Sequence, residues 1–164
     1  MLVQAAETRF QRGIAALEAG RGIEALALFE AAIELERRLG AGVPQARYMS
    51  WYGLTIALEA PRLREGAALC RQAIALEFYN ADLCWNYGRV LLAADDRRGA
   101  FDAFLKGLKV QKSHAGIQRE LSRMGWRRRP VLPFLDRANL LNRMLGKLLH
   151  GATPVRGKTA RGTA

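Results

Sequence analysis

The chain has 164 residues, of which 50% are hydrophobic, and it carries a formal net charge of +11. This length suits a single domain, and this hydrophobic content is ample for a buried core. The charge is unevenly distributed, because residues 1–110 hold 14 basic and 13 acidic residues whereas residues 111–164 hold 12 and 2. The near-neutral first part excludes a basic, nucleic-acid-binding surface along the whole chain and confines the basic character to the C-terminal third.

No segment is suited to cross a membrane or to direct secretion. The longest uncharged apolar stretch, residues 48–58, is about half of the ~20 residues that a spanning helix needs. Residues 1–10 lack a basic start followed by an apolar run, so no signal peptide is expected. The two cysteines, Cys70 and Cys84, occupy helix-packing positions. Two thiols without a secretory signal predict a reducing compartment, and hence a cytoplasmic location.

Apolar residues at helical spacing predict three pairs of helices. The first pair covers residues 2–19 and 22–39, the second covers 44–60 and 62–78, and the third begins at Asn80 and includes 98–108. Glycine, proline or aspartate interrupts the apolar pattern between these helices. The side chain of Asn80 and the Asp95-Asp96 pair are predicted to cap the helices that follow them.

The second helix of each pair repeats one pattern of small and large residues. The three copies are Ala25, Phe29 and Ala32; Gly66, Cys70 and Ala73; and Ala100, Phe104 and Gly107. Each first helix carries a glycine at nearly the same distance upstream, namely Gly13, Gly53 and Gly88. Over residues 7–112 this pattern resembles the tetratricopeptide-repeat family. The resemblance implies an all-α solenoid of three helical hairpins, with the glycine helix of each pair packed on its partner.

A capping helix is predicted after the third hairpin. Residues 114–124 place three apolar side chains on one face, with Ser113 as the predicted N-cap and Gly125 at the C-terminal end. Repeat arrays need a terminal helix with one polar face, and this segment meets that need.

The segment after the capping helix changes character. Pro130 and Pro133 exclude a helix over 126–136 and favour an extended backbone. Residues 137–149 are predicted to form an amphipathic helix whose polar face has no acidic residue. This extension resembles one that follows the repeats in some small bacterial tetratricopeptide-repeat proteins. The sequence thus predicts a repeat domain with its capping helix (1–125), a basic arm (126–150) and a disordered tail (151–164).

The basic arm is the candidate for a second contact. Its cationic residues are Arg127, Arg128, Arg129, Arg137, Arg143 and Lys147. The apolar half of its helix is expected to dock on the capping helix and the third hairpin, with a partner protein and an anionic membrane surface left open as alternatives. Nucleic acid is the least favoured target, because Trp126 and Phe134 are the only stacking aromatics in this region.

The sequence predicts no enzyme, cofactor or metal site. Residues 152–159 match a relaxed phosphate-loop pattern, but no strand precedes them and too few residues follow for a helix. His114 and His150 lack Cys or Asp neighbours at ligand spacing, so both are predicted to be exposed to solvent rather than bound to metal. No nucleophile, base and orienting residue can be assembled from the spacing.

The family resemblance implies a concave groove lined by the first helices. Counted from the three glycines, the inward positions are Glu7, Phe10, Ile14, Leu17, Arg47, Ser50, Leu54, Ala57, Asp82, Trp85, Arg89 and Leu92. The predicted contact residues among them are Phe10, Ile14, Arg47, Ser50, Leu54, Asp82, Trp85 and Arg89. Lys and Asn residues that grip a C-terminal carboxylate in some family members are absent, which argues against that mode of binding.

Two interpretations of this groove remain open from the sequence. Its aromatic, aliphatic and arginine residues suit a peptide or helix of a partner protein, which predicts a non-catalytic scaffold or adaptor. Phe10 and Trp85 are equally consistent with ordinary packing between helices. The competing function is a membrane-surface or nucleic-acid-associated protein that uses the basic arm as its main contact.

Overall fold

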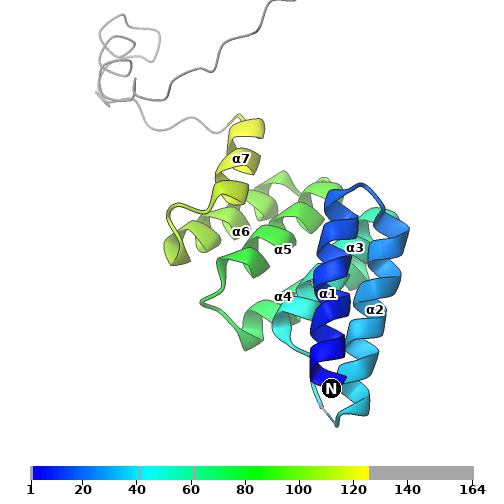
Figure 1. The fold of residues 1–164 in the computed structure, drawn as a ribbon. Helices are drawn as coiled ribbons and strands as arrows, with labels where there is room; N and C mark the ends of the chain where they lie inside the picture. Colours follow the sequence, from blue (N-terminus) through cyan, green and yellow to red (C-terminus); the bar gives the residue numbers. More distant parts are fainter. Residues whose placement is uncertain (1, 41, 61, 126–164) are drawn as a thin grey trace, which may run out of the picture. The chain divides into compact units, whose positions relative to one another are not determined.

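The structure, a computed structural model, describes residues 2–40, 42–60 and 62–125 (Figure 1). These residues contain seven α-helices and no strand, and they form one compact unit. The helices are α1 (Leu2–Glu18), α2 (Gly22–Arg38), α3 (Ala46–Glu59), α4 (Leu63–Leu76), α5 (Ala81–Ala93), α6 (Arg97–Val110) and α7 (Ala115–Arg123). The predicted all-α class is confirmed. Within the described residues, no helix has the length and apolar content needed to span a bilayer.

Several predictions concern residues outside the described ranges. They are the basic arm (126–150) with its helix (137–149), the tail (151–164), His150, and the cationic residues Arg127, Arg128, Arg129, Arg137, Arg143 and Lys147.

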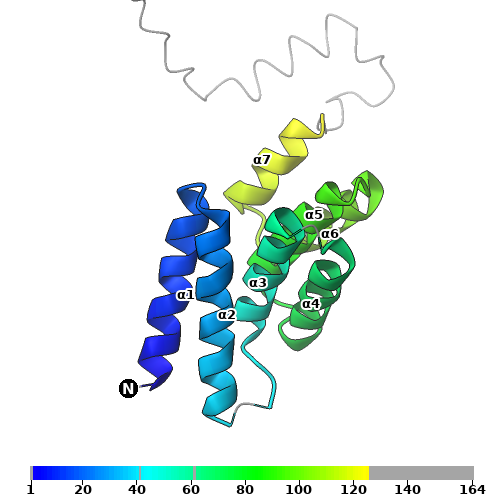
Figure 2. The ribbon, with the colours of Figure 1, turned by 90° about the vertical axis from the view of Figure 1, so that its right-hand side faces the viewer.

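Three helical hairpins follow one another along the chain. The helices α1 and α2, α3 and α4, and α5 and α6 pack as consecutive pairs, and α7 packs on α6 (Figures 1 and 2). The helix α3 contacts α1, α2 and α5 in addition to α4, so it lies at the centre of the array. Figure 2 shows the first hairpin as the longest, since α1 and α2 have 17 residues each.

The repeated glycines are explained by the close approach of helices within each hairpin. A Cβ atom on Gly13 would lie 2.6 Å from the ring of Phe29, and one on Gly88 would overlap the ring of Phe104. In the middle hairpin Cys70 replaces the aromatic residue, and the backbones themselves meet: a Cβ on Gly53 would lie 2.8 Å from the carbonyl oxygen of Gly66. The first and third hairpins therefore fill the glycine space with a ring, and the second fills it with backbone.

Two of the three predicted N-caps are confirmed. The side chain of Asn80 accepts a hydrogen bond from the Asp82 amide at 3.1 Å, and that of Asp96 accepts one from the Gly99 amide at 2.8 Å. The prediction of Ser113 as the cap of α7 is wrong. The cap is His114, whose Nδ1 accepts from the Ile117 amide at 3.1 Å, because the imidazole can reach the backbone while remaining buried.

The connection between the first two hairpins is held by a buried carboxylate. Glu36 is 7% exposed, and its two oxygens accept hydrogen bonds from the backbone amide of Gln45 at 2.8 Å and from its side-chain amide at 2.6 Å. The backbone of Gln45 is consequently extended, and α3 begins at Ala46 rather than at residue 44 as predicted. These bonds fix the wider spacing between the first and second hairpins.

Candidate functional site

A hollow of about 470 Å³ opens beside the first helices of the hairpins. It is called the inner hollow below, and its lining residues are Leu17, Glu18, Trp51, Trp85, Arg89, Arg119, Glu120 and Arg123. They come from α1, α3, α5 and α7, so the capping helix contributes to the lining. Of the predicted inward positions, Leu17, Trp85 and Arg89 meet here.

Two tryptophans form the aromatic part of the inner hollow. Trp51 and Trp85 meet edge to face, with ring centroids 6.2 Å apart and an interplanar angle of 87°. On its α7 side the ring of Trp85 lies against Gly116, where an added Cβ atom would come within 2.6 Å of the ring. The centroids of the Trp85 and His114 rings are 5.5 Å apart. Trp85 is therefore half-buried: one part of it packs in the core and another lines the hollow.

Arg89 places a cation on this aromatic surface. Its guanidinium carbon lies 5.1 Å from the centroid of the Trp85 ring, within the range of a cation–π interaction. Burial lowers the pKa of Arg89, and the charge of Glu120 opposes that shift. An arginine remains charged under all ordinary conditions. The hollow therefore contains a half-buried positive charge beside two tryptophans.

Glu7 and Phe10, two of the predicted inward residues of the first hairpin, form a cluster with residues of α3 instead. The carboxylate of Glu7 pairs with Arg47 and accepts hydrogen bonds from the Tyr48 hydroxyl at 2.7 Å and the Gln11 side chain at 2.7 Å. The hydrogen bond from Gln11 lowers the pKa of Glu7, and so do the hydrogen bonds from Tyr48 and Arg47. Burial and the neighbouring Glu7 carboxylate raise the pKa of Tyr48. Arg47 also covers the ring of Phe10 at 5.2 Å. Its charge is thus already compensated within the chain.

Three predicted contact residues are too deeply buried to touch a partner. Phe10 is 2% exposed, and Ser50 and Leu54 are fully buried. The hydroxyl of Ser50 accepts a hydrogen bond from the side-chain amide of Asn86 at 3.2 Å, which joins α3 to α5. For Ser50 and Leu54 the physical reason is the central position of α3, whose inward side chains are covered by α1 and α5. Phe10, on α1, is covered by Phe29, Tyr48 and Arg47. Ile14, by contrast, is half-buried against the core of the first hairpin.

Asp82 and His114 form a pair that the sequence did not predict. The Nε2 atom of His114 lies 2.8 Å from a carboxylate oxygen of Asp82, and the imidazole is buried at 7% exposure. The prediction that His114 is exposed to solvent is therefore wrong, because α7 folds back onto α5 and covers it. Asp82 holds the capping helix through this pair, while its own side chain stays 61% exposed. No group of three or more metal-binding side chains gathers anywhere among the described residues.

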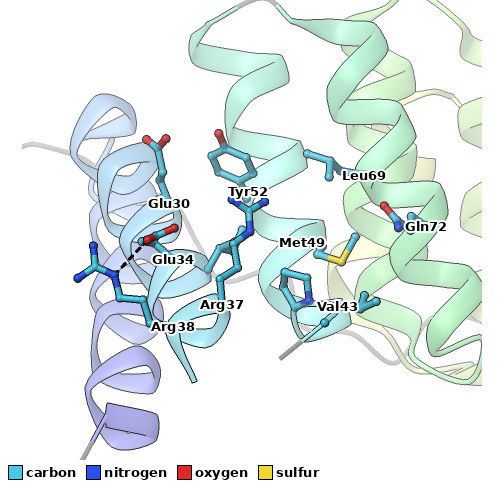
Figure 3. A pocket seen from close by; sticks show the side chains of 12 residues that line it. Glu30, Glu34, Arg37, Arg38, Val43, Met49, Tyr52, Leu69 and Gln72 are labelled. Carbon is cyan, nitrogen blue, oxygen red and sulfur yellow. Dashed lines mark hydrogen bonds and ion pairs between the residues drawn. The ribbon is translucent and has the colours of Figure 1, made fainter. Parts of the chain in front are cut away.

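A second hollow, called the outer hollow below, has a volume of about 500 Å³ (Figure 3). It lies between α2, the following connection, α3 and α4, and its lining residues are Glu30, Ile33, Glu34, Arg37, Arg38, Gly42, Val43, Pro44, Met49, Tyr52, Leu69 and Gln72. Figure 3 shows Tyr52, Met49 and Leu69 facing the charged side chains of α2. Glu34 and Arg38 form an ion pair at 3.0 Å. The wide first connection creates this hollow, and no sequence pattern predicted it.

Compared by sequence, the chain matches no protein-family model and no curated protein. Its fold, however, matches solved structures of one kind. They include the tetratricopeptide-repeat (TPR) domain of Arabidopsis OM64 (17% identity, 76% of this chain and 98% of that chain, TM-score 0.60). The first TPR domain of Spaghetti (RPAP3) bound to an HSP90 peptide matches with 13% identity, 74% of this chain, 94% of that chain and a TM-score of 0.58. A third structure is PcrH in complex with the chaperone binding region of PopB. It matches with 16% identity, 74% of this chain, 93% of that chain and a TM-score of 0.54.

This chain has a TPR fold. The assignment confirms the resemblance drawn from the repeated glycines and small residues. It also explains the composition of the inner hollow, because in a TPR array the first helices of successive hairpins share one face. The capping helix α7 packs on α6 and lines the inner hollow together with α5, and so it extends that face.

Five lining residues of the inner hollow were not among the predicted positions: Glu18, Trp51, Arg119, Glu120 and Arg123. Trp51 lies one position after Ser50. Counting inward positions within a single repeat selected Ser50, whereas Trp51 is the residue that lines the inner hollow. No pattern in the sequence distinguishes it from Tyr48 and Tyr52, the other aromatic residues of α3. Arg119, Glu120 and Arg123 could have been found by treating the polar face of α7 as a continuation of the TPR inner face.

Proposed function

We propose that this chain is a non-catalytic interaction module that binds a peptide or helix of a partner protein in the inner hollow. The observation that carries the proposal is the meeting of Trp51, Trp85 and Arg89 in one accessible hollow on the inner face. Tryptophan and arginine are the residue types most enriched among those that dominate binding energy at protein interfaces. A hollow of about 470 Å³ is within the ~300–1,000 Å³ range of known ligand sites.

Two of the similar structures support the proposal. RPAP3 is bound there to an HSP90 peptide, and PcrH is in complex with a segment of PopB. Both are proteins of the same fold that hold a segment of another protein. The partner of this chain has to be sought through its own groove residues, of which Leu17, Trp85 and Arg89 were implied by the family resemblance and the others were not.

The competing function has one observation in its favour. Residues 111–164 hold 12 basic and 2 acidic residues, as expected of an arm that contacts an anionic membrane or a nucleic acid. Salt separates the two functions. Binding to many phosphates or anionic lipids weakens steeply as salt rises, whereas binding through one ion pair and contact with two tryptophans weakens much less. Partner binding through the inner hollow is expected to persist at about 0.3–0.5 M salt, where the Debye length is roughly 4–6 Å.

The proposal is tested by blocking each hollow in turn. Arg123 lines the inner hollow and Arg38 the outer one, and the two are matched: both are exposed (74% and 70%) and each forms an ion pair with a glutamate on its own helix. Each is replaced by cysteine (Arg123→Cys, Arg38→Cys) and coupled to a bulky maleimide. The native Cys70 and Cys84 are buried, and burial raises the pKa of Cys70 to about 12, so both should stay unlabelled.

Partner proteins captured from the native cell extract by the unmodified full chain serve as the readout. The labelled Arg123→Cys chain should lose them, because the label fills the inner hollow, whereas the labelled Arg38→Cys chain should retain them. Retention by both labelled chains would contradict the proposal. Loss only by the Arg38→Cys chain would move the binding site to the outer hollow.

A further inference from the structure

Arg89 brings a half-buried positive charge into the inner hollow. Its guanidinium is half-buried and lies on the Trp85 ring, and no described carboxylate comes within ion-pair distance of it. A cation that loses part of its hydration without gaining a partner is costly to bury. Such an arrangement is expected where the partner comes from outside the chain.

The lining of the hollow carries an excess of positive charge. The lining has three arginines and two glutamates. Glu120 is already engaged, since it lies 3.6 Å from Arg123, and Glu18 forms no ion pair with a described residue. Arg89 and Arg119 are therefore two cations without an ion-pair partner in the described part of the chain.

We propose that the inner hollow selects a partner segment in which an acidic side chain stands beside an aromatic or aliphatic one. The carboxylate pairs with the guanidinium of Arg89, and the apolar side chain rests on Trp51 and Leu17. This inference rests on the proposed function and names the chemistry of the partner. The contact with Trp85 restricts the guanidinium, so less side-chain freedom is lost when the carboxylate binds.

The same features disfavour other ligands. A lysine or arginine of a partner would meet the half-buried charge of Arg89 without compensation. A nucleic-acid backbone brings successive phosphates, and the two glutamates of the lining would repel them. A single carboxylate beside an apolar group satisfies both the charge and the aromatic surface.

The test uses small probes and the full chain. The carboxylate probe is 4-phenylbutyrate, its neutral counterpart is 4-phenylbutyramide, and inorganic phosphate is the third probe. Binding is followed by the NMR signals of the tryptophan indole N–H groups. One of these is the buried indole N–H of Trp85, which has no hydrogen-bond acceptor among the described residues. Three proteins are compared: the natural chain, Arg89→Gln, and Arg37→Gln, which removes the same charge from the outer hollow.

For the natural chain, 4-phenylbutyrate should bind with a millimolar Kd and shift the Trp51 and Trp85 signals. The amide should bind about tenfold more weakly, which corresponds to one charge-assisted hydrogen-bonded pair. Arg89→Gln should abolish this difference, and Arg37→Gln should preserve it. An unchanged helical circular dichroism spectrum and an unchanged denaturation midpoint in Arg89→Gln would establish that the fold is intact.

Equal binding of the carboxylate and the amide to the natural chain would overturn the inference, as would the absence of binding by both. Tighter binding of phosphate than of 4-phenylbutyrate would also overturn it, in favour of a phosphate-bearing ligand. These outcomes are separable from failure of the proposed function. If the label on Arg123→Cys still displaces the captured partners while the probes show no preference for a carboxylate, the binding site stands and only its chemistry is wrong.

Discussion

Gly66→Leu is expected to lower the free energy of unfolding by about 3 kcal/mol, the upper end of the usual cost of overpacking, or more. Gly66 faces Gly53 with no side chain between the two backbones, so that a Cβ atom at position 66 would overlap the carbonyl oxygen of Gly53. A neighbouring side chain can rotate away from an added group, but the backbone of a central helix cannot. The substitution therefore separates α3 from α4. Chemical denaturation followed by circular dichroism measures the loss.

The matched control is Ala68→Leu. It adds a similar side chain to the same helix at an exposed position, where surface substitutions usually change stability by within about 0.5 kcal/mol. A similar loss in both variants would mean that bulk on α4 is harmful anywhere. A loss below about 0.5 kcal/mol in Gly66→Leu would mean that the two backbones do not meet as described.

Phe104→Ala is expected to cost about 3–5 kcal/mol, the range for truncation of a buried aromatic side chain. Phe104 is fully buried and fills the space above Gly88. It belongs to one apolar cluster with Ala100, Ile117 and Leu121, and the last two are on α7. The cavity would therefore loosen the capping helix as well as the third hairpin. Denaturation measures the total loss, and hydrogen exchange shows faster exchange of the α7 amides.

Phe78→Ala makes the same chemical change at a side chain that is 76% exposed. It should leave both the stability and the α7 amides unchanged within about 0.5 kcal/mol. If Phe104→Ala lowered stability while the α7 amides kept their protection, the capping helix would not depend on this cluster. That result would contradict the description of α7 as an integral part of the repeat domain.

Much of the fold could be predicted because one physical constraint recurs. Two helices that approach closely need small residues at fixed spacing, and Gly13, Gly53 and Gly88 carry that constraint into the sequence. Local hydrogen bonding is equally visible, as the caps at Asn80 and Asp96 show. These features depend only on neighbours within one hairpin. A single sequence is sufficient to find them.

The site was harder to predict because it depends on contacts between hairpins. Ser50 and Leu54 occupy inward positions within their repeat, yet α1 and α5 cover them from both sides. The reach of α7 over α5, which buries His114 beside Asp82, is likewise set by packing between elements rather than by spacing within one. Trp85 was expected either to line a groove or to pack between helices, and it does both, since it lines the inner hollow and packs against Gly116.

Photo-cross-linking from the two hollows tests most directly whether a partner binds at the inner face. A photoreactive benzoylphenylalanine is placed at Arg119 in the inner hollow, and in a second chain at Gln72 in the outer hollow; both positions are exposed. Each chain is irradiated with the partner captured by the natural chain. The proposed function predicts a covalent adduct from position 119 and none from position 72. An adduct from position 72 alone would contradict it.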